Sequence, residues 1–294
     1  MISTKEIARD TLETLERGWY INTHGDKVDI KEMTARAVEG SIHYHHSFCL
    51  PIPTLENHRY PTKIVFSNLS SLQAARMMTT ESDSVTVLNF ASAKNPGGGF
   101  IGGAIAQEEC IARSSMLYPC LMKFFPLKDH YFEINRTWSA NRERHLYSNC
   151  AIFSPRVPVI KTDTRDATHL DSPYTCSVIT IPAPNTGVYR SANEKDDINI
   201  ENVLRERIDR VLSIALVHEA KDLVLGAFGC GVFRNNPFVV ATIFKTLLDG
   251  KFQSCFRTAH FAILTRKPTT DRNLCAFLQV FQPSESNILI TNPH

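Results

Sequence analysis

Short runs of β-branched and aromatic residues recur along the chain, separated by longer segments in which apolar residues return every three or four positions. The clearest run is Val-Thr-Val-Leu-Asn-Phe at residues 85–90, which is apolar almost throughout and predicts a strand buried on both faces. Further strands are expected at residues 151–153, 177–181, 223–228 and 260–265.

Amphipathic segments between these runs predict helices. The best-delimited helix follows Asn236, a capping residue, has Pro237 as its first residue and ends at Gly250. The segment that begins at Ser3 also carries capping residues and an apolar stripe, and Gly18 is expected to end it. The remaining helices are expected at residues 71–78, 107–122 and 202–219.

Strands that alternate with helices predict an α/β fold, with a mixed or parallel sheet covered by helices on both faces. Residues 21–61 show no regular pattern and contain several prolines. Since no internal repeat or low-complexity linker is present, we expect residues 1–294 to form a single domain. Residues 1–80 would form an N-terminal accessory helical region packed on it.

Composition narrows the class of protein. The formal net charge of +2 provides no strongly basic footprint for nucleic acid and leaves only a local patch open, so no sequence-specific nucleic-acid partner is expected. The N-terminus lacks a signal-peptide core, and no run approaches the roughly 20 apolar residues that cross a bilayer. None of the eight cysteines lies in a C-x-x-C pair, which favours reduced, mostly buried thiols. We therefore expect a soluble monomer in the cytoplasm or elsewhere inside the cell, with export by a signal-less route left open.

The candidate chemistry follows the strand at residues 85–90. A loop with three glycines permits unusual backbone angles and lets a ligand approach main-chain amides. Glu108 and Glu109 then stand near the start of the next helix, where one carboxylate can donate a proton to a leaving group while the other orients hydroxyls or water. Such a pair beside a phosphate-binding loop suits cleavage of the glycosidic bond of a nucleotide sugar. The glycines are Gly97, Gly98 and Gly99.

A second glycine-rich segment, residues 226–233, lies between a predicted strand and the helix that begins at Pro237. Main-chain amides at such a junction can bind a phosphate. Two loops of this kind at the carboxyl ends of sheet strands would hold a diphosphate from two sides.

Three glycines, seven intervening residues and Gln-Glu-Glu resemble the signature of poly(ADP-ribose) glycohydrolases. The flanking LNFASAKNPGGGF and the later LVLGAFGCGVFRN look like the microbial type of that family, which is built on a macrodomain. SPRVPV, SVITIPAPN and the N-terminal helix are similar to it as well, so the resemblance covers nearly the whole chain.

The resemblance implies a hydrolase that releases ADP-ribose from poly(ADP-ribose) or from an ADP-ribosylated protein, without a metal or other cofactor. Glu109 would be the catalytic acid, and Glu108 would bind the ribose hydroxyls. The other residues implied at the substrate are Asn95, Gly97, Gly98, Gly99 and Gln107 on the first loop and helix, and Gly229, Cys230, Gly231, Val232 and Phe233 on the second loop.

Two other functions compete with this one. A non-catalytic ADP-ribose-binding macrodomain would need the loops but not the carboxylates, so Glu108 and Glu109 argue against it. A hydrolase of mono-ADP-ribosylated proteins, specific for one side chain such as arginine, fits the near-neutral charge somewhat better than a polyanionic substrate does. A dinucleotide-binding reading of Gly97, Gly99 and Gly102 is rejected, because no second strand with an acidic end follows at the required distance.

Several other polar residues have plainer interpretations. His43, His45 and His46 invite a metal site but lack further ligands at a recognisable spacing, so a packing or surface role is expected. Arg113 would either meet a phosphate or neutralise Glu109, and Cys230 is expected to be a small packing residue. The charged residues Arg205, Glu206, Arg207, Asp209 and Arg210 are expected to form a solvated helix face.

Overall fold

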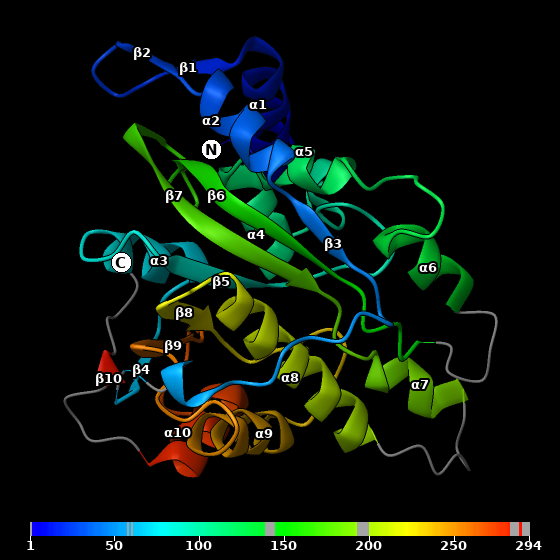
Figure 1. Ribbon diagram of the computed structural model, residues 1–294. Helices are drawn as coiled ribbons and strands as arrows, with labels where there is room; N and C mark the ends of the chain where they lie inside the picture. The colour runs from blue at the N-terminus through cyan, green and yellow to red at the C-terminus, as the bar shows by residue number, and fades with distance from the viewer. Residues whose placement is uncertain are drawn as a thin grey trace.

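The computed structural model describes residues 2–57, 59, 61–138, 145–192, 200–282 and 288–289 (Figure 1). Within these residues the centre is an eight-stranded sheet in the order β10-β4-β9-β8-β5-β7-β6-β3. Each pair of neighbours from β10 to β7 is parallel. The last two pairs, β7 with β6 and β6 with β3, are antiparallel. The strands are β3 (Ile42–Tyr44), β4 (Lys63–Ser67), β5 (Val85–Phe90), β6 (Ala151–Lys161), β7 (His169–Ile181), β8 (Asp222–Leu225), β9 (Thr258–Ala262) and β10 (Ile288–Leu289).

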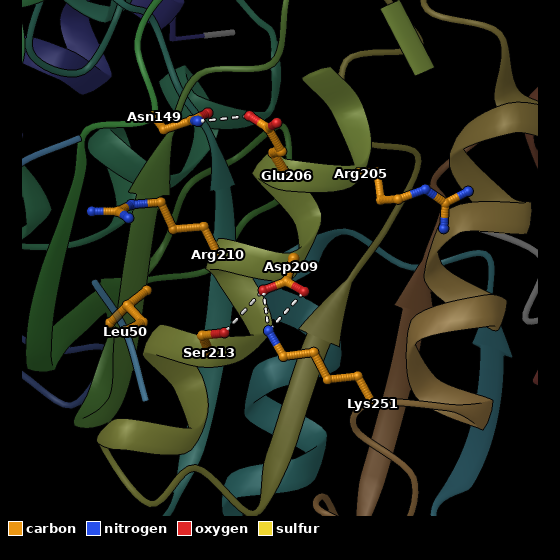
Figure 2. A pocket seen from close by; sticks show the side chains of 8 residues that line it. All are labelled: Leu50, Asn149, Arg205, Glu206, Asp209, Arg210, Ser213 and Lys251. Atoms are coloured by element: carbon orange, nitrogen blue, oxygen red, sulfur yellow. Dashed lines mark hydrogen bonds and ion pairs between the residues drawn. The ribbon is translucent and has the colours of Figure 1, made fainter. Parts of the chain in front are cut away.

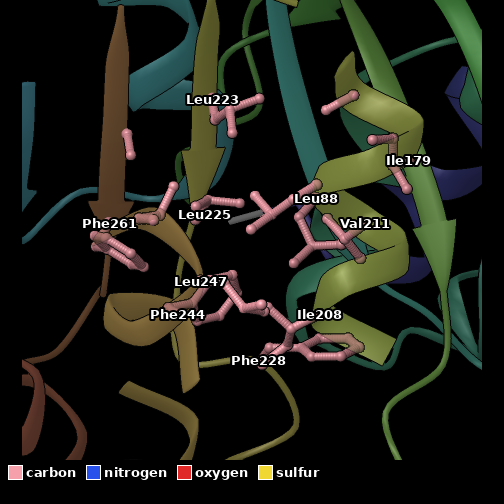
Figure 3. Close-up of a cluster of buried hydrophobic side chains, with 14 of the residues drawn as sticks. Leu88, Ile179, Ile208, Val211, Leu223, Leu225, Phe228, Phe244, Leu247 and Phe261 are labelled. Carbon is pink, nitrogen blue, oxygen red and sulfur yellow. The ribbon is translucent and has the colours of Figure 1, made fainter. Parts of the chain in front are cut away.

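Alternate side chains of the central strands enter two separate cores. Leu88, Ile179 and Leu225 face α8 (Ile200–Val217), α9 (Pro237–Asp249) and α10 (Arg272–Phe281) (Figure 3). The preceding residues Val87, Val178 and Val224 lie in the core of the opposite face. That face is covered by α2 (Lys31–Glu39), α3 (Ser71–Thr79), α4 (Gln107–Ser114), α5 (Leu117–Met122) and α6 (Tyr131–Trp138). The α/β class with a mixed sheet flanked by helices is thus confirmed.

The capping signals act as expected. Ser3 and Glu6 form a capping box at the start of α1 (Thr4–Arg17), and Gly18 ends this helix with φ +77°. The Asn236 side chain accepts a hydrogen bond from the Phe238 amide, with Pro237 as the first residue of α9. Local side-chain chemistry therefore sets these helix ends.

The N-terminal layer is more regular than its sequence pattern suggests. Residues 21–61, expected to be irregular, contain the end of the β1–β2 hairpin (Trp19–Ile21, Lys27–Asp29), α2, β3 and a short 3-10 helix, η1 (Leu55–Asn57). These elements are too short to produce a clear period. β3 and β4 also belong to the main sheet, so only the segment before β3 packs outside it, as the top of Figure 1 shows.

The helix expected at residues 107–122 is in fact two helices. Ser115 is extended and bridges Val159 of β6, while the Met116 amide donates a hydrogen bond to the Pro158 carbonyl at 2.8 Å. Pairing with β6 therefore ends α4 at Ser114, and α5 begins at Leu117.

The expectation of a solvated charged face on α8 is wrong for two of its five residues. Arg207 and Arg210 are 1% and 9% exposed, whereas Arg205 and Glu206 face the surface. A charged residue is usually exposed because burial costs its hydration, but these guanidinium groups find carbonyl oxygens inside the protein.

Across the described ranges, no helix combines the length and apolar character needed to span a membrane.

Candidate active site

Three parallel strands, β8, β5 and β7, end at one edge of the sheet and carry the candidate loops there. The ring of Phe90, the last residue of β5, and the ring of Phe228, which follows β8, meet edge to face with centroids 5.8 Å apart. A Cβ at Gly226 would lie 3.0 Å from Cζ of Phe90. The two glycine-rich segments therefore begin side by side.

The first loop makes a tight turn at its glycines, where a side chain would not fit. Gly97 and Gly98 have φ of +66° and +59°, values that L side chains rarely adopt. A Cβ at Gly98 would lie 2.3 Å from Oε1 of Glu109 and 3.0 Å from Oε2 of Glu108. Both carboxylates therefore converge on Gly98, and any larger residue there would displace them.

Glu108 lies in the protein interior, 3% exposed. Its Oε2 accepts a hydrogen bond from the Ser92 amide at 2.6 Å, and Oε1 accepts one from Asn89 Nδ2 at 3.3 Å. Burial raises the pKa of this carboxyl to about 8, and the neighbouring Glu109 raises the pKa further, against these hydrogen bonds. Glu108 is therefore largely protonated near neutral pH.

Glu109 is less buried and faces the loop. Its Oε1 accepts a hydrogen bond from the Gly99 amide at 2.9 Å, across the turn of the glycines. Within the described part of the chain no donor is bonded to its other oxygen, Oε2. This carboxyl is consequently held at one atom and open at the other.

The Gln107 side chain points into the protein rather than to a ligand. Its Nε2 donates to the Leu88 carbonyl at 2.8 Å and to Ser71 Oγ at 3.0 Å, and its Oε1 accepts from the Phe90 amide at 2.8 Å. Both amide hydrogens are used, so Gln107 fastens the start of α4 to β5 and α3 instead of contacting substrate through its side chain.

The Arg113 guanidinium is bonded inside the protein, and among the described residues no ion pair joins it to Glu109. Its Nη1 is hydrogen-bonded to the Ala104 carbonyl, and Nη2 lies 3.3 Å from Cys110 Sγ. The buried guanidinium thus ties α4 to the segment that leads into it.

Helix α6 supports the chain between β5 and the glycines. The Tyr131 hydroxyl donates to the Ser92 carbonyl at 3.1 Å, and Arg136 Nη2 donates to the Lys94 carbonyl at 2.8 Å. Asn95, at the start of the loop, is exposed, and its carbonyl accepts a hydrogen bond from the Gly98 amide.

The second loop is held from beneath by Asn235. The buried Asn235 Nδ2 donates to the Gly229 and Pro184 carbonyls at 3.0 and 2.9 Å, and its Oδ1 accepts from Thr186 Oγ1 at 2.5 Å. Gly229 has φ +70°, and a Cβ there would lie 2.4 Å from Cβ of Ala183. This loop is therefore locked to the segment that follows β7.

The outer residues of the second loop differ in exposure. Gly231 is exposed, with no atom within 4 Å of a Cβ built there, and Val232 is 79% exposed. Phe233 is half-buried, and its ring centroid lies 6.0 Å from that of Tyr147. Cys230 packs on the core, where burial raises the pKa of its thiol to about 12, so it is no nucleophile at neutral pH.

The three histidines form an aromatic cluster with a fourth. The His43 ring lies 5.1 Å from the His130 ring and 6.2 Å from the His45 ring, while His45 and His46 are 4.0 Å apart. Burial lowers the pKa of His43 to about 4, so it is neutral. No group of three possible metal ligands occurs among the residues that the structure describes. All eight cysteines are free thiols, and four are buried.

Sequence reasoning missed the residues that hold the carboxylates. Asn89 is fully buried in β5, and Ser92 and Tyr131 complete the support of Glu108. A lone polar residue inside an otherwise apolar strand was the available signal for Asn89, because a buried amide needs partners. Ser92 acts through its backbone, which no side-chain pattern reveals.

Comparison with known proteins places this site in context. The family described as microbial-type PARG, catalytic domain, matches residues 8–162. Poly(ADP-ribose) glycohydrolase from Thermomonospora curvata, bound to the inhibitor ADP-HPD, is 38% identical with a TM-score of 0.79, over 94% of this chain and 98% of that chain. The enzyme of the same name from Deinococcus radiodurans, in complex with ADP-ribose, is 33% identical with a TM-score of 0.73, over 85% and 96%. No match was found among curated proteins.

Proposed function

The chain belongs to the microbial-type poly(ADP-ribose) glycohydrolase family and is an ADP-ribosyl glycohydrolase, and from this premise we propose which residues bind and cleave its substrate. ADP-ribose lies between the two glycine-rich loops, with Glu108 and Glu109 at the bond that breaks. The convergence of both carboxylates on Gly98 carries this proposal, because it leaves two acidic groups of different exposure at one point beside a loop of main-chain amides.

The proton for the leaving group comes from this carboxyl pair. Glu108 keeps a proton near neutral pH, and its carboxyl lies beside that of Glu109 at Gly98. A ribose hydroxyl that donates a hydrogen bond to Glu108 favours the carboxylate form of this residue, so the proton moves from Glu108 to Glu109.

Protonated Glu109 then gives the proton to the leaving oxygen as the glycosidic bond breaks. The ribose becomes oxocarbenium-like and is stabilised by the nearby diphosphate and Glu108. The Glu109 carboxylate takes a proton from the attacking water, so ADP-ribose and the free acceptor are released and the pair regains its starting charge.

The loop residues divide between binding and support. Gly98, Gly99, Gly231 and Val232 line the proposed substrate path, with Asn95 and Phe233 at the distal ribose. Gly97, Gln107, Gly229 and Cys230 contact the protein itself and hold the loops in place.

We propose poly(ADP-ribose) as the substrate, because the similar solved enzymes carry that name and cover most of this chain. Hydrolysis of mono-ADP-ribosylated protein is the second candidate, since near-neutral charge provides no general attraction for a polyanion. The eight free thiols support an intracellular location.

Release of ADP-ribose from four substrates tests this proposal. The purified protein is offered polymer, arginine-linked, glutamate-linked and serine-linked ADP-ribose. We expect release from the polymer. Release from one protein linkage alone would favour the second candidate, and tight binding of ADP-ribose without release from any substrate would contradict the catalytic roles.

A further inference from the structure

Arg207 is among the largest fully buried side chains of the described residues, and every partner of its guanidinium is an uncharged oxygen. Its Nε donates to Asn149 Oδ1 at 2.7 Å, and Nη2 donates to the Leu146 and Tyr147 carbonyls at 3.2 Å. Nη1 is hydrogen-bonded to the Pro182 carbonyl. One side chain of α8 thereby joins the segment before β6 to the segment after β7.

The charge of Arg207 has no buried counter-ion in the part of the chain that the structure describes. Its electrostatic neighbours Tyr131 and Cys150 are neutral at ordinary pH, because burial raises the pKa of both. Burial also lowers the pKa of Arg207, but only to about 10, so the guanidinium stays protonated.

The carboxylate linked to this network is outside the protein interior. Glu206 is exposed and reaches Arg207 only through Asn149, whose Nδ2 donates to Glu206 Oε2 at 3.3 Å. Figure 2 shows Asn149 and Glu206 facing each other at the edge of a surface pocket. A solvated carboxylate that is separated from the guanidinium by the Asn149 side chain offsets little of a charge that lies in a low-dielectric interior.

The carbonyl groups that Arg207 binds belong to one wall of the proposed ADP-ribose site, formed by residues 145–147 and 182–185. Tyr147 has φ +61°, and its ring packs on Phe233 of the second loop. Pro182 precedes Ala183, the residue that Gly229 contacts. The His145 carbonyl accepts a hydrogen bond from the Asn185 amide at 2.7 Å, which joins the two segments a second time.

We propose that Arg207 is a positioning residue of the ADP-ribose site, which fixes this wall against the second glycine-rich loop and supplies the buried positive charge that favours the diphosphate. The inference rests on the proposed placement of ADP-ribose between the loops. A buried cation without a counter-ion costs free energy of solvation, and a dianionic ligand bound nearby recovers part of that cost. Arginine suits the task because its planar fork reaches carbonyls of separate segments at once.

Two substitutions separate the effect of the positive charge of Arg207 from the effect of its hydrogen bonds. Arg207→Met removes both, whereas Arg207→Lys keeps the charge and loses most of the hydrogen bonds. Arg205→Met is the matched control, because Arg205 lies two positions earlier on α8, carries the same charge and is 39% exposed in an ion pair with Glu201. The dissociation constant for ADP-ribose is measured by calorimetry, and thermal unfolding shows that each variant is folded.

We expect Arg207→Met to weaken ADP-ribose binding by about 10- to 100-fold, as misplacement of a binding wall does, and to raise KM more than it lowers kcat. Arg207→Lys should recover at least about 10-fold of that loss, and Arg205→Met should bind like the wild type. If Arg207→Met fails to fold, Arg207→Gln, which retains an N–H donor for the carbonyls, takes its place.

Equal losses in the lysine and neutral variants would overturn the role of the charge, and unchanged binding in a folded neutral variant would overturn the whole inference. Failure of the wild-type protein to bind ADP-ribose would instead contradict the proposed function, so the two failures are distinguishable.

Discussion

The glycines of the second loop are needed for different reasons, which the atoms around each position separate. At Gly229 a Cβ would meet Ala183 and Asn235 at 2.4 Å, in a backbone conformation with φ +70°. At Gly231 a Cβ would meet no atom within 4 Å. The first glycine is thus required by the fold, and the second leaves room for something outside the chain.

Substitution at these two glycines should therefore give opposite results. Gly231→Leu should fold with wild-type stability but bind ADP-ribose at least about 10-fold more weakly, because the side chain fills the space in which the diphosphate approaches the amides. Gly229→Ala should lose about 1 kcal/mol or more of unfolding free energy. Thermal unfolding and calorimetry on both variants check this. Wild-type affinity in Gly231→Leu would remove Gly231 from the binding surface.

The buried Glu108 makes stability depend on pH. Its pKa in the folded protein is about 8, against an ordinary value of 4.5. As the pH rises through this interval the unfolded chain loses the proton while the folded protein retains it, so the folded state becomes progressively less stable.

Glu108→Gln removes this loss of stability at high pH, because glutamine has no proton to lose. We expect the variant to gain stability relative to the wild type as the pH is raised from about 5 to about 9, by a few kcal/mol at most. Chemical denaturation of both proteins at the two pH values measures the difference. If the difference is the same at both, Glu108 is ionised in the folded protein across the range.

At the scale of elements, the N-terminal helix α1 clamps α4, the helix that carries Glu108 and Glu109, at both ends. Thr4 Oγ1 donates to the Gly103 carbonyl at 2.9 Å, just before α4, and Thr11 Oγ1 donates to the Arg113 carbonyl at 2.5 Å, near its end. Between them Ala8 packs with Phe100 and Ala112 in a small core of its own. The buried Lys161 Nζ donates to Thr11 Oγ1 at 2.6 Å and pairs with Asp10 at 2.7 Å.

This clamp predicts that a distant hydroxyl affects catalysis. Thr11→Val keeps the shape of the side chain but leaves the Lys161 ammonium and the Arg113 carbonyl each short of a partner, which costs about 1–3 kcal/mol of stability. We expect a lower kcat as well, since α4 positions both carboxylates.

Thr14→Val is the matched control for the clamp. Thr14 is equally buried on the same helix, but within the described residues its hydroxyl only accepts a long hydrogen bond from Arg17, at 3.4 Å. Unfolding and steady-state kinetics on both variants are compared. Equal kcat in Thr11→Val and Thr14→Val would mean that α1 does not position α4 for catalysis.

At the scale of the whole molecule, the sequence predicts the layers well because the central strands carry nearly continuous apolar runs. Val85–Phe90 occurs as β5 at its expected bounds, and α9 has the expected cap and end. The same signals place both glycine-rich loops at strand ends on one edge of the sheet.

Features decided by tertiary contacts could not be predicted in this way. Ser115 interrupts a helical pattern because it pairs with Val159, far along the chain. Arg207 has the sequence surroundings of a surface residue, and only the folded backbone supplies its carbonyl partners. The roles of Ser92 and Gln107 likewise depend on where β5 and α4 meet.

The central claim is that Glu109 delivers the proton that releases ADP-ribose. Glu109→Gln keeps the size of the side chain and can still accept the Gly99 amide hydrogen through its amide oxygen. Since it cannot donate a carboxylic proton, the account predicts that single-turnover release from poly(ADP-ribose) falls by about 10²- to 10⁴-fold while the affinity for ADP-ribose stays within a few-fold of the wild type. Near wild-type release by a folded Glu109→Gln variant would contradict the account.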